Sequence, residues 1–204
     1  MTETHAPFLY LASKSPRRQE LLRQIGIEFH LLPPDDHVAA EALEEPVAGE
    51  SPTVYVKRVV QAKLETAVER MVAKGLPRAP VLAADTTVAV GGTILGKPVD
   101  ADDAVRMLRL LSGRTHRVLT AIALASGSRR ALTVNVSRVT FCRLSKVVID
   151  DYVASGEPFD KAGGYGIQGR AGGFARRIEG SYSGIMGLPL YETERLVGGL
   201  LARP

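Results

Sequence analysis

The stretch FLYLASKSPRRQELLRQIG, residues 8–26, decides the fold class of this chain of 204 residues. Its first five residues form a short apolar run, which is typical of a buried strand. Ser15 at the expected cap, Pro16 at the first helical position and Gly26 just past the end predict a helix of about three turns. The chain therefore opens with a strand, a tight turn and a helix, which is an α/β pattern.

Strand and helix patterns continue to alternate along the chain. Helical patterns follow cap residues and cover residues 51–74, 100–113, 145–156 and 189 onward. Extended patterns cover residues 81–87, a hairpin at 88–95 with its turn at Gly91-Gly92, 116–126, 129–144 and 174–178. Residues 33–52 are expected to form a surface loop, and residues 157–173 are rich in glycine. Because no repeat or long linker interrupts the pattern, we predict one domain over residues 1–204.

The composition excludes several classes of protein. Hydrophobic residues make up 45% and charged residues 24%, which argues against disordered and collagen-like chains. No apolar run reaches the roughly 18 residues of a membrane helix, and the N-terminus lacks the features of a signal peptide. A net charge of only +4, 5% aromatic residues and no tryptophan argue against a nucleic-acid partner. We therefore expect a soluble cytoplasmic protein without a membrane or nucleic-acid partner.

Two arginines stand at an unfavourable place in the first helix. Arg17 and Arg18 occupy its first turn, where the helix dipole is already positive. A bound anion would reverse the sign of this interaction, because the free backbone N–H groups and both guanidiniums would then face negative charge. Together with the serine-rich turn around Ser13 and Ser15, the arrangement predicts a phosphate site. The alternative is that both arginines point into water.

Three further charged residues are candidates for the same site. Asp85 comes at the expected carboxyl end of the buried strand that starts at Val81, where open α/β sheets bind ligands. Its carboxylate suits a Mg²⁺ or Mn²⁺ ion, the orientation of a water, or both; the alternative is that it caps a backbone turn. Lys63, on the edge of an apolar helix stripe, and Lys97, in a proline-stiffened loop, suit phosphate oxygens. The alternative is that both are ordinary surface lysines.

Residues 164–169 match the pattern G-x-G-x-x-G without its usual context. A dinucleotide-binding fingerprint follows a strand and opens a helix, whereas this segment follows a loop and precedes a strand. We therefore reject that function and expect the glycines to let the backbone approach a ligand, with Gln168 available to hydrogen-bond it.

The segment LASKSPRRQELL, residues 11–22, resembles the signature of the Maf family of nucleoside triphosphate pyrophosphatases. Other blocks resemble the family's remaining motifs in the same order, at residues 84–86, 95–98, 111–116, 161–169, 180–182 and 187–190. The resemblance spans about residues 8–197 and is greatest to the dTTP/UTP branch. It implies a Maf/inosine-triphosphatase-like α/β fold, with a mixed twisted sheet flanked by helices and two lobes around a cleft.

The resemblance also implies a reaction and its residues. Members of this branch hydrolyse dTTP and UTP to the monophosphate and pyrophosphate with a divalent metal, as a house-cleaning step, and a homodimer is the family expectation. The residues linked to substrate choice match Arg17, Thr86 and Gln168, the proton acceptor matches Asp85, and further active-site residues match Ser13, Arg18, Lys63 and Lys97. The family often has an Asp-Glu pair after the first helix; here the chain reads Asp35-Asp36-His37, so Asp36 is the predicted metal ligand beside Asp85.

Two alternatives remain open at this point. The first is a 7-methyl-GTP pyrophosphatase, which is another branch of the same family. The second is a non-catalytic role as a septum-formation inhibitor or nucleotide-binding protein. Asp85 separates an enzyme from a protein that only binds, because a protein that only binds polyanions gains nothing from a carboxylate beside its basic groups.

Overall fold

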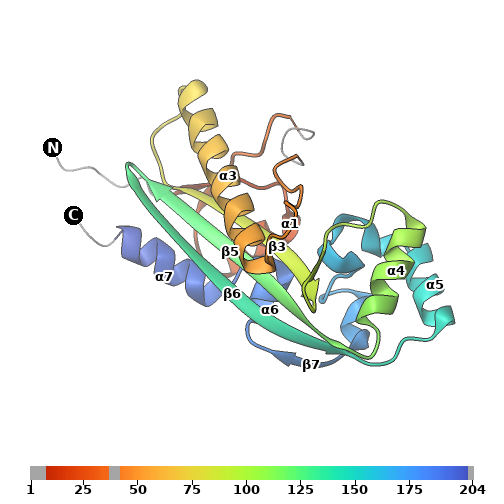
Figure 1. Ribbon diagram of the computed structural model, residues 1–204. Coiled ribbons are helices and arrows are strands. Elements are labelled where there is room, and N and C mark those ends of the chain that lie inside the picture. The colour runs from red at the N-terminus through yellow and green to blue at the C-terminus, as the bar shows by residue number, and fades with distance from the viewer. Residues whose placement is uncertain (1–7, 37–41, 202–204) are drawn as a thin grey trace.

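The computed structural model describes residues 8–36 and 42–201 and shows a mixed sheet flanked by helices (Figure 1). The strands are β1 Leu9–Leu11, β2 Phe29–Leu31, β3 Val81–Val90, β4 Thr93–Leu95, β5 Thr115–Ser126, β6 Arg129–Phe141 and β7 Ala175–Glu179. Their order is β2-β1-β3-β5-β6-β7, with β4 pairing to β3. β1 runs parallel to β2 and β3, and the other pairs are antiparallel. The predicted α/β class is confirmed.

The helices begin where the sequence places cap residues. They are α1 Pro16–Gln24, α3 Pro52–Ala73, α4 Ala101–Leu111, α5 Lys146–Ala154, α6 Tyr182–Met186 and α7 Leu190–Leu201. The side chains of Ser51, Asp100 and Ser145 each accept a hydrogen bond from the backbone N–H three residues farther along the chain, as expected of N-caps. Ser15 precedes α1 but makes no side-chain capping bond, so that part of the prediction is wrong.

Several short elements escaped the sequence patterns. β2 has three residues and lies at the edge of the sheet, and α6 has five residues. The glycine-rich stretch forms three 3₁₀ turns, Glu157–Asp160, Ala162–Gly164 and Arg170–Phe174. Elements this short show too few repeats of any hydrophobic period to be recognised.

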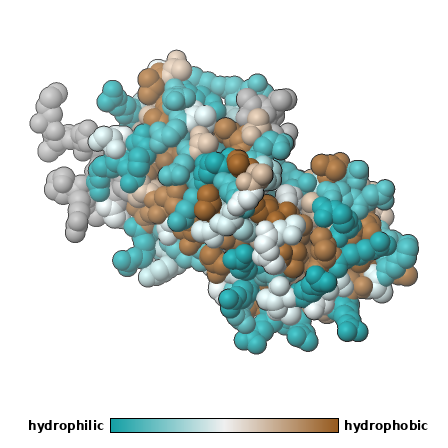
Figure 2. All heavy atoms as spheres, in the orientation of Figure 1, coloured by the Kyte–Doolittle hydropathy of each residue, from teal (hydrophilic) through white to brown (hydrophobic). Residues whose placement is uncertain are grey.

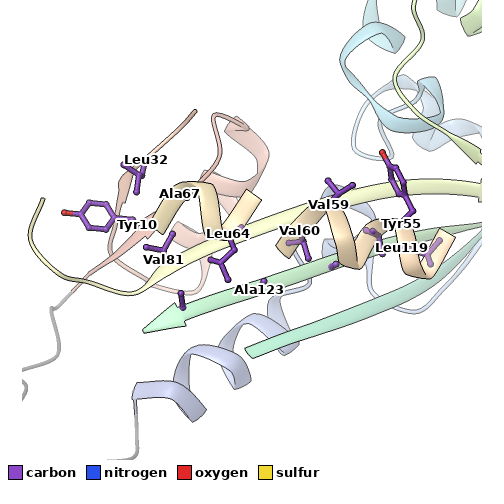
Figure 3. Close-up of a cluster of buried hydrophobic side chains, with 14 of the residues drawn as sticks. Tyr10, Leu32, Tyr55, Val59, Val60, Leu64, Ala67, Val81, Leu119 and Ala123 are labelled. Carbon is purple, nitrogen blue, oxygen red and sulfur yellow. The ribbon is translucent and has the colours of Figure 1, made fainter. Parts of the chain in front are cut away.

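Three clusters of buried side chains form the core. α3 lays Val59, Val60 and Leu64 on one face of β3 and β5, as Figure 3 shows. α1 and α7 cover the opposite face, and a third cluster joins α4 and α5 to the far ends of β3, β5 and β6. Two lobes result, visible in Figure 1, and the same long strands pass through both.

The surface is mostly hydrophilic on the face shown in Figure 2, with hydrophobic residues gathered toward the middle, where the α4 lobe meets the long strands. Within residues 8–36 and 42–201, no helix combines the length and the apolar composition needed to cross a membrane.

A gap along one edge of β3 separates the lobes. β1 pairs with β3 only at Val81 and Leu82, and β4 pairs with it only from Val88 to Val90. Among the described residues, no strand covers residues 83–87 on that side. The turn that follows β1 therefore faces an open strand edge, and this edge forms the floor of a cleft.

The α4 lobe contains a buried histidine that makes stability depend on pH. His116 is 1% exposed, and its Nε2 lies 2.7 Å from the Tyr165 hydroxyl. Burial lowers the pKa of His116 from its ordinary 6.5 to about 4. In the part of the chain that the structure describes, its Nδ1 has no hydrogen-bond partner, so nothing compensates a proton added there.

We expect the free energy of unfolding to fall by on the order of 3 kcal/mol as the pH drops from 6.5 to 4, because the unfolded chain takes up the proton first. Denaturant unfolding across this range measures how the free energy of unfolding depends on pH. His116→Phe should reduce this pH dependence, and His30→Gln, which changes an exposed histidine of β2, should leave it unchanged. A pH dependence that His116→Phe does not alter would contradict the assignment.

Candidate functional site

A cavity of about 670 Å³ lies along the open edge of β3 between the two lobes. It brings together residues far apart in the sequence, from the β1–α1 turn, α3, β3, the loop after β4 and the glycine-rich stretch. Its lining includes all ten residues singled out from the sequence: Ser13, Ser15, Arg17, Arg18, Asp36, Lys63, Asp85, Thr86, Lys97 and Gln168.

The position of Asp85 corrects one prediction. The strand does not end at this residue but continues from Val81 to Val90, and Asp85 lies in its middle. The carboxyl end of a strand does open onto the cavity, but that strand is β1. Asp85 reaches the cavity because the neighbouring β1 stops early, which leaves the edge of β3 uncovered.

Strand alternation sends Asp85 and Thr86 to opposite faces of the sheet. Asp85 shares the face of Ala83, which packs under α3, and its Oδ1 lies 2.6 Å from Lys63 Nζ. Thr86 turns toward the other face, where its hydroxyl lies 3.0 Å from that of Thr120. The open edge allows both faces to contribute to one cavity.

A chain of alternating charges crosses the cavity. Lys63 Nζ lies 2.6 Å from both Asp85 Oδ1 and Glu44 Oε1, and Lys97 Nζ lies 3.4 Å from Glu44 Oε2. Burial alone would raise the pKa of Glu44, but Lys63 and Lys97 outweigh it, so the pKa is lowered. The two carboxylates therefore face each other across a shared ammonium group.

Arg18 is built into the floor of the site. Its Nε donates to the Gly187 carbonyl at 2.9 Å, Nη1 to Ser13 Oγ at 3.3 Å and Nη2 to Thr86 Oγ1 at 3.4 Å. Burial lowers the pKa of Arg18, while Asp85 opposes that effect. The interpretation that both arginines point into water is therefore wrong for Arg18. Its charge is held rigidly beside the N-terminus of α1.

The remaining predicted residues differ in their exposure. Arg17 Nη1 is 3.7 Å from Asp160 Oδ2, and its side chain is 27% exposed. Gln168 and Asp36 are exposed residues of the cavity wall. Ser13 is buried, and its Oγ accepts the Ser15 N–H at 3.1 Å, which fixes the turn that leads into α1.

The glycine-rich stretch packs closely against the protein itself. A Cβ on Gly163, whose φ is +71°, would lie 2.9 Å from the side chain of Val88, and a Cβ on Gly166 would lie 2.8 Å from Lys161 Cε. At these two glycines the backbone therefore packs closely against side chains of the protein itself. This packing holds the segment that carries Gln168 against the rest of its lobe.

Several cavity residues were missed by the sequence analysis, namely Glu44, Tyr55, Arg70, Asp160 and Lys161. The segment around Glu44 has no periodic pattern, so its acid-rich composition was the only available signal. Within the described ranges, no group of three or more His, Cys, Asp or Glu side chains is placed to hold a metal ion. Asp85 and Glu44 both contact Lys63 Nζ, and Asp36 also lines the cavity.

Comparisons with known proteins show the family of this chain. The family model described as Maf-like protein matches residues 8–200. A Ralstonia nicotianae protein named dTTP/UTP pyrophosphatase is 58% identical over 192 residues, covering 94% of this chain and 93% of that protein. A protein of the same name from Albidiferax ferrireducens is 55% identical over 190 residues, covering 93% and 95%. The solved structure of the Staphylococcus aureus Ham1 protein aligns at 15% identity over 65% of this chain and 71% of that one, with a TM-score of 0.42. By the family model and by relatives of this similarity, the chain belongs to the Maf-like proteins.

Proposed function

We propose that this protein hydrolyses dTTP and UTP to the nucleoside monophosphate and pyrophosphate. The observation that carries the proposal is Asp85, a buried carboxylate held 2.6 Å from Lys63 in a cavity lined by cations. A site that only bound polyanions would place no carboxylate there. The names of the 58% and 55% identical relatives support the same reaction.

Asp85 is proposed to orient the attacking water and take its proton. The water oxygen forms a bond to the α-phosphorus, and the bond from that phosphorus to the bridging oxygen breaks, so pyrophosphate leaves with the electron pair. Lys63 keeps Asp85 in place for this step. General-base catalysis of this kind contributes about 10²- to 10⁴-fold to a rate.

The cations of the cavity are proposed to bind the triphosphate. Arg18 and Arg17 lie at the N-terminus of α1, where backbone N–H groups also favour an anion. Lys63 and Lys97 contact different carboxylate oxygens of Glu44, and both are proposed to meet phosphate oxygens. Fixed positive charge stabilises the negative charge that develops on the leaving pyrophosphate.

The donor set fits a hard divalent cation such as Mg²⁺ or Mn²⁺. Such ions prefer oxygen ligands, and Mg²⁺ is commonly held by one or two carboxylates together with substrate phosphates and waters. Asp85 and Glu44 are the carboxylates we propose to hold it, and Asp36 stays a predicted ligand. When bound, the ion would neutralise phosphate charge.

Gln168 is proposed to select the base. Its amide offers one acceptor and two donor hydrogens, which complement the N3–H and O4 of uracil and thymine, whereas cytosine presents the reverse pattern. A mismatched base leaves polar groups unpaired, which is a strong source of discrimination. Gln168 is an exposed residue that lines the same cavity as Arg17 and Arg18.

Gln168→Glu is therefore expected to reduce the ratio of kcat/KM for UTP over CTP by at least about tenfold, because the substituted carboxylate accepts but does not donate. Pyrophosphate release from both nucleotides measures the ratio. Glu192→Gln, a change of similar size on α7, serves as the control. An unchanged ratio in Gln168→Glu would remove this residue from base selection.

A substrate panel tests the whole proposal. Pyrophosphate release from UTP, dTTP, CTP, GTP and 7-methyl-GTP is measured with Mg²⁺ or Mn²⁺. Turnover confined to UTP and dTTP is the expected result. Turnover of 7-methyl-GTP instead would favour the other branch of the family, and absence of all turnover would favour a nucleotide-binding role. A homodimer and a role in septum formation stay predictions from the resemblance, and a cytoplasmic location stays a prediction from the composition.

A further inference from the structure

Two side chains of α3 hold the backbone that carries Glu44. Tyr55 Oη donates to the Glu44 carbonyl at 2.7 Å. Arg58 Nη1 donates to the Leu43 carbonyl at 3.1 Å, and Nη2 donates to the Glu45 carbonyl at 2.9 Å. Three consecutive carbonyl groups are thus bound by two residues one helical turn apart. We call Tyr55 and Arg58 the α3 clamp.

The clamp is itself held in place. Arg58 Nε and Nη2 each lie 2.8 Å from a carboxylate oxygen of Glu50, and this side chain is only 6% exposed. The guanidinium also lies over the Tyr55 ring, 5.5 Å from its centroid. Tyr55 is 5% exposed and belongs to the same buried row of α3 as Val59 (Figure 3). A planar guanidinium with this many fixed partners has little freedom to move.

The clamp sets the direction of the Glu44 side chain. Residues 43–45 form no strand and no long helix, so no ladder of backbone hydrogen bonds holds them. Their carbonyls are instead bound to α3, and the Glu44 carboxylate reaches Lys63, which lies farther along the same helix. One helix therefore supplies both the anchor for the backbone of Glu44 and the ammonium group that meets its carboxylate.

We propose that Arg58 and Tyr55 are positioning residues that hold Glu44 for the divalent cation and the triphosphate. The inference rests on the proposed function, in which Glu44 and Asp85 are the carboxylates of the cation site. Arg58 acts through the backbone of residues 43–45. Residues that orient a metal ligand without touching the metal typically change its affinity by about 10- to 100-fold when they are replaced.

Mn²⁺ binding measured by electron paramagnetic resonance, without nucleotide, tests the proposal directly. Arg58→Met is expected to weaken Mn²⁺ binding by at least about tenfold, as is Glu44→Gln. Tyr55→Phe, which removes only the hydroxyl, should weaken it by a smaller factor. Arg130→Met is the matched control, because Arg130 forms a comparable ion pair with Glu65 of α3 that does not touch residues 43–45.

A second readout separates positioning from a general loss of structure. Hydrogen exchange of the amides in residues 42–50 should accelerate in Arg58→Met and not in Arg130→Met, while exchange in β5 stays slow in both. Should Arg58→Met fail to fold, Tyr55→Phe carries the same comparison. Wild-type Mn²⁺ affinity in both clamp variants would overturn the inference, as would wild-type Mn²⁺ binding that Glu44→Gln does not weaken.

The two proposals fail in different ways. If the wild-type protein bound Mn²⁺ through Glu44 but released no pyrophosphate from UTP or dTTP, the proposed function would be lost and the clamp retained. If it hydrolysed UTP normally in Arg58→Met with unchanged KM for Mn²⁺, the clamp would be lost and the function retained.

Discussion

Asp85→Asn is expected to lower kcat for UTP by about 10²- to 10⁴-fold, because an amide neither takes the proton of the attacking water nor carries negative charge. The substitution keeps the size of the side chain within β3, where Asp85 is 5% exposed. Lys63 retains Glu44 as an ion-pair partner, so the fold should persist. Pyrophosphate release and binding of a non-hydrolysable UTP analogue, measured side by side, separate loss of chemistry from loss of binding.

Asp150→Asn is the matched control for this experiment. Asp150 lies on α5 and pairs with Lys146 at the surface, 2.5 Å away, so its loss should leave turnover unchanged. Undiminished turnover in Asp85→Asn would exclude this residue as the proton acceptor. If the same variant abolished a cellular effect while turnover persisted, a role in binding a partner would gain support.

Lys63→Met is expected to impair both stability and activity. Without the ammonium group, the buried carboxylate of Asp85 loses its ion-pair partner, and Glu44 beside it keeps only its contact with Lys97. Removing one partner from a buried ion pair costs about 3 to 5 kcal/mol, and we expect about 3 kcal/mol here because the Lys63 side chain is 18% exposed. kcat/KM for UTP should fall by about a hundredfold, since a fixed charge near the phosphates is lost.

The loss of stability in Lys63→Met should depend on pH. Two facing carboxylates raise the pKa of one of them, so the folded variant binds a proton more readily than the unfolded chain as the pH falls. In the wild type the pKa of Glu44 is lowered, so stability from that group is lost on acidification. The difference in free energy of unfolding between the two proteins should therefore be larger at pH 8 than at pH 5.

Denaturant unfolding in the presence of a chelator measures this difference. Lys57→Met, which removes one exposed charge from the same helix, is the control and should show no such pH dependence. A Lys63→Met variant as stable as the wild type at pH 8 would show that the two carboxylates do not share Lys63 in solution.

Local sequence signals were sufficient for the longer elements. α3 begins at Pro52, directly after its cap residue Ser51, and ends at Ala73, as its cap and its apolar repeat predict. The hairpin of β3 and β4 turns at Gly91, whose φ is +59°, which a residue without a side chain adopts at little cost. These features depend on residues that are close together in the sequence, so they can be predicted from the sequence directly.

The site was predicted in part. The dipole argument at Arg17 and Arg18 and the isolated acid at Asp85 both identified residues that line the cavity. Glu44 was missed, because it is held by Tyr55 and Arg58, which lie 11 and 14 residues farther along the chain and on another element. No local pattern reports a contact of that kind.

The sequence by itself determined the α/β class, the long helices and strands, and some of the charged residues that line the cavity, because periodicity, capping and helix dipoles act over a few residues. The tertiary structure decided that β1 and β4 leave residues 83–87 of β3 uncovered, which turns the middle of a strand into the floor of a cleft. It also decided that Asp85, Lys63 and Glu44 meet within hydrogen-bonding distance. Both outcomes depend on pairing between segments distant in sequence, and only the packing of the whole chain sets which strand edge stays open.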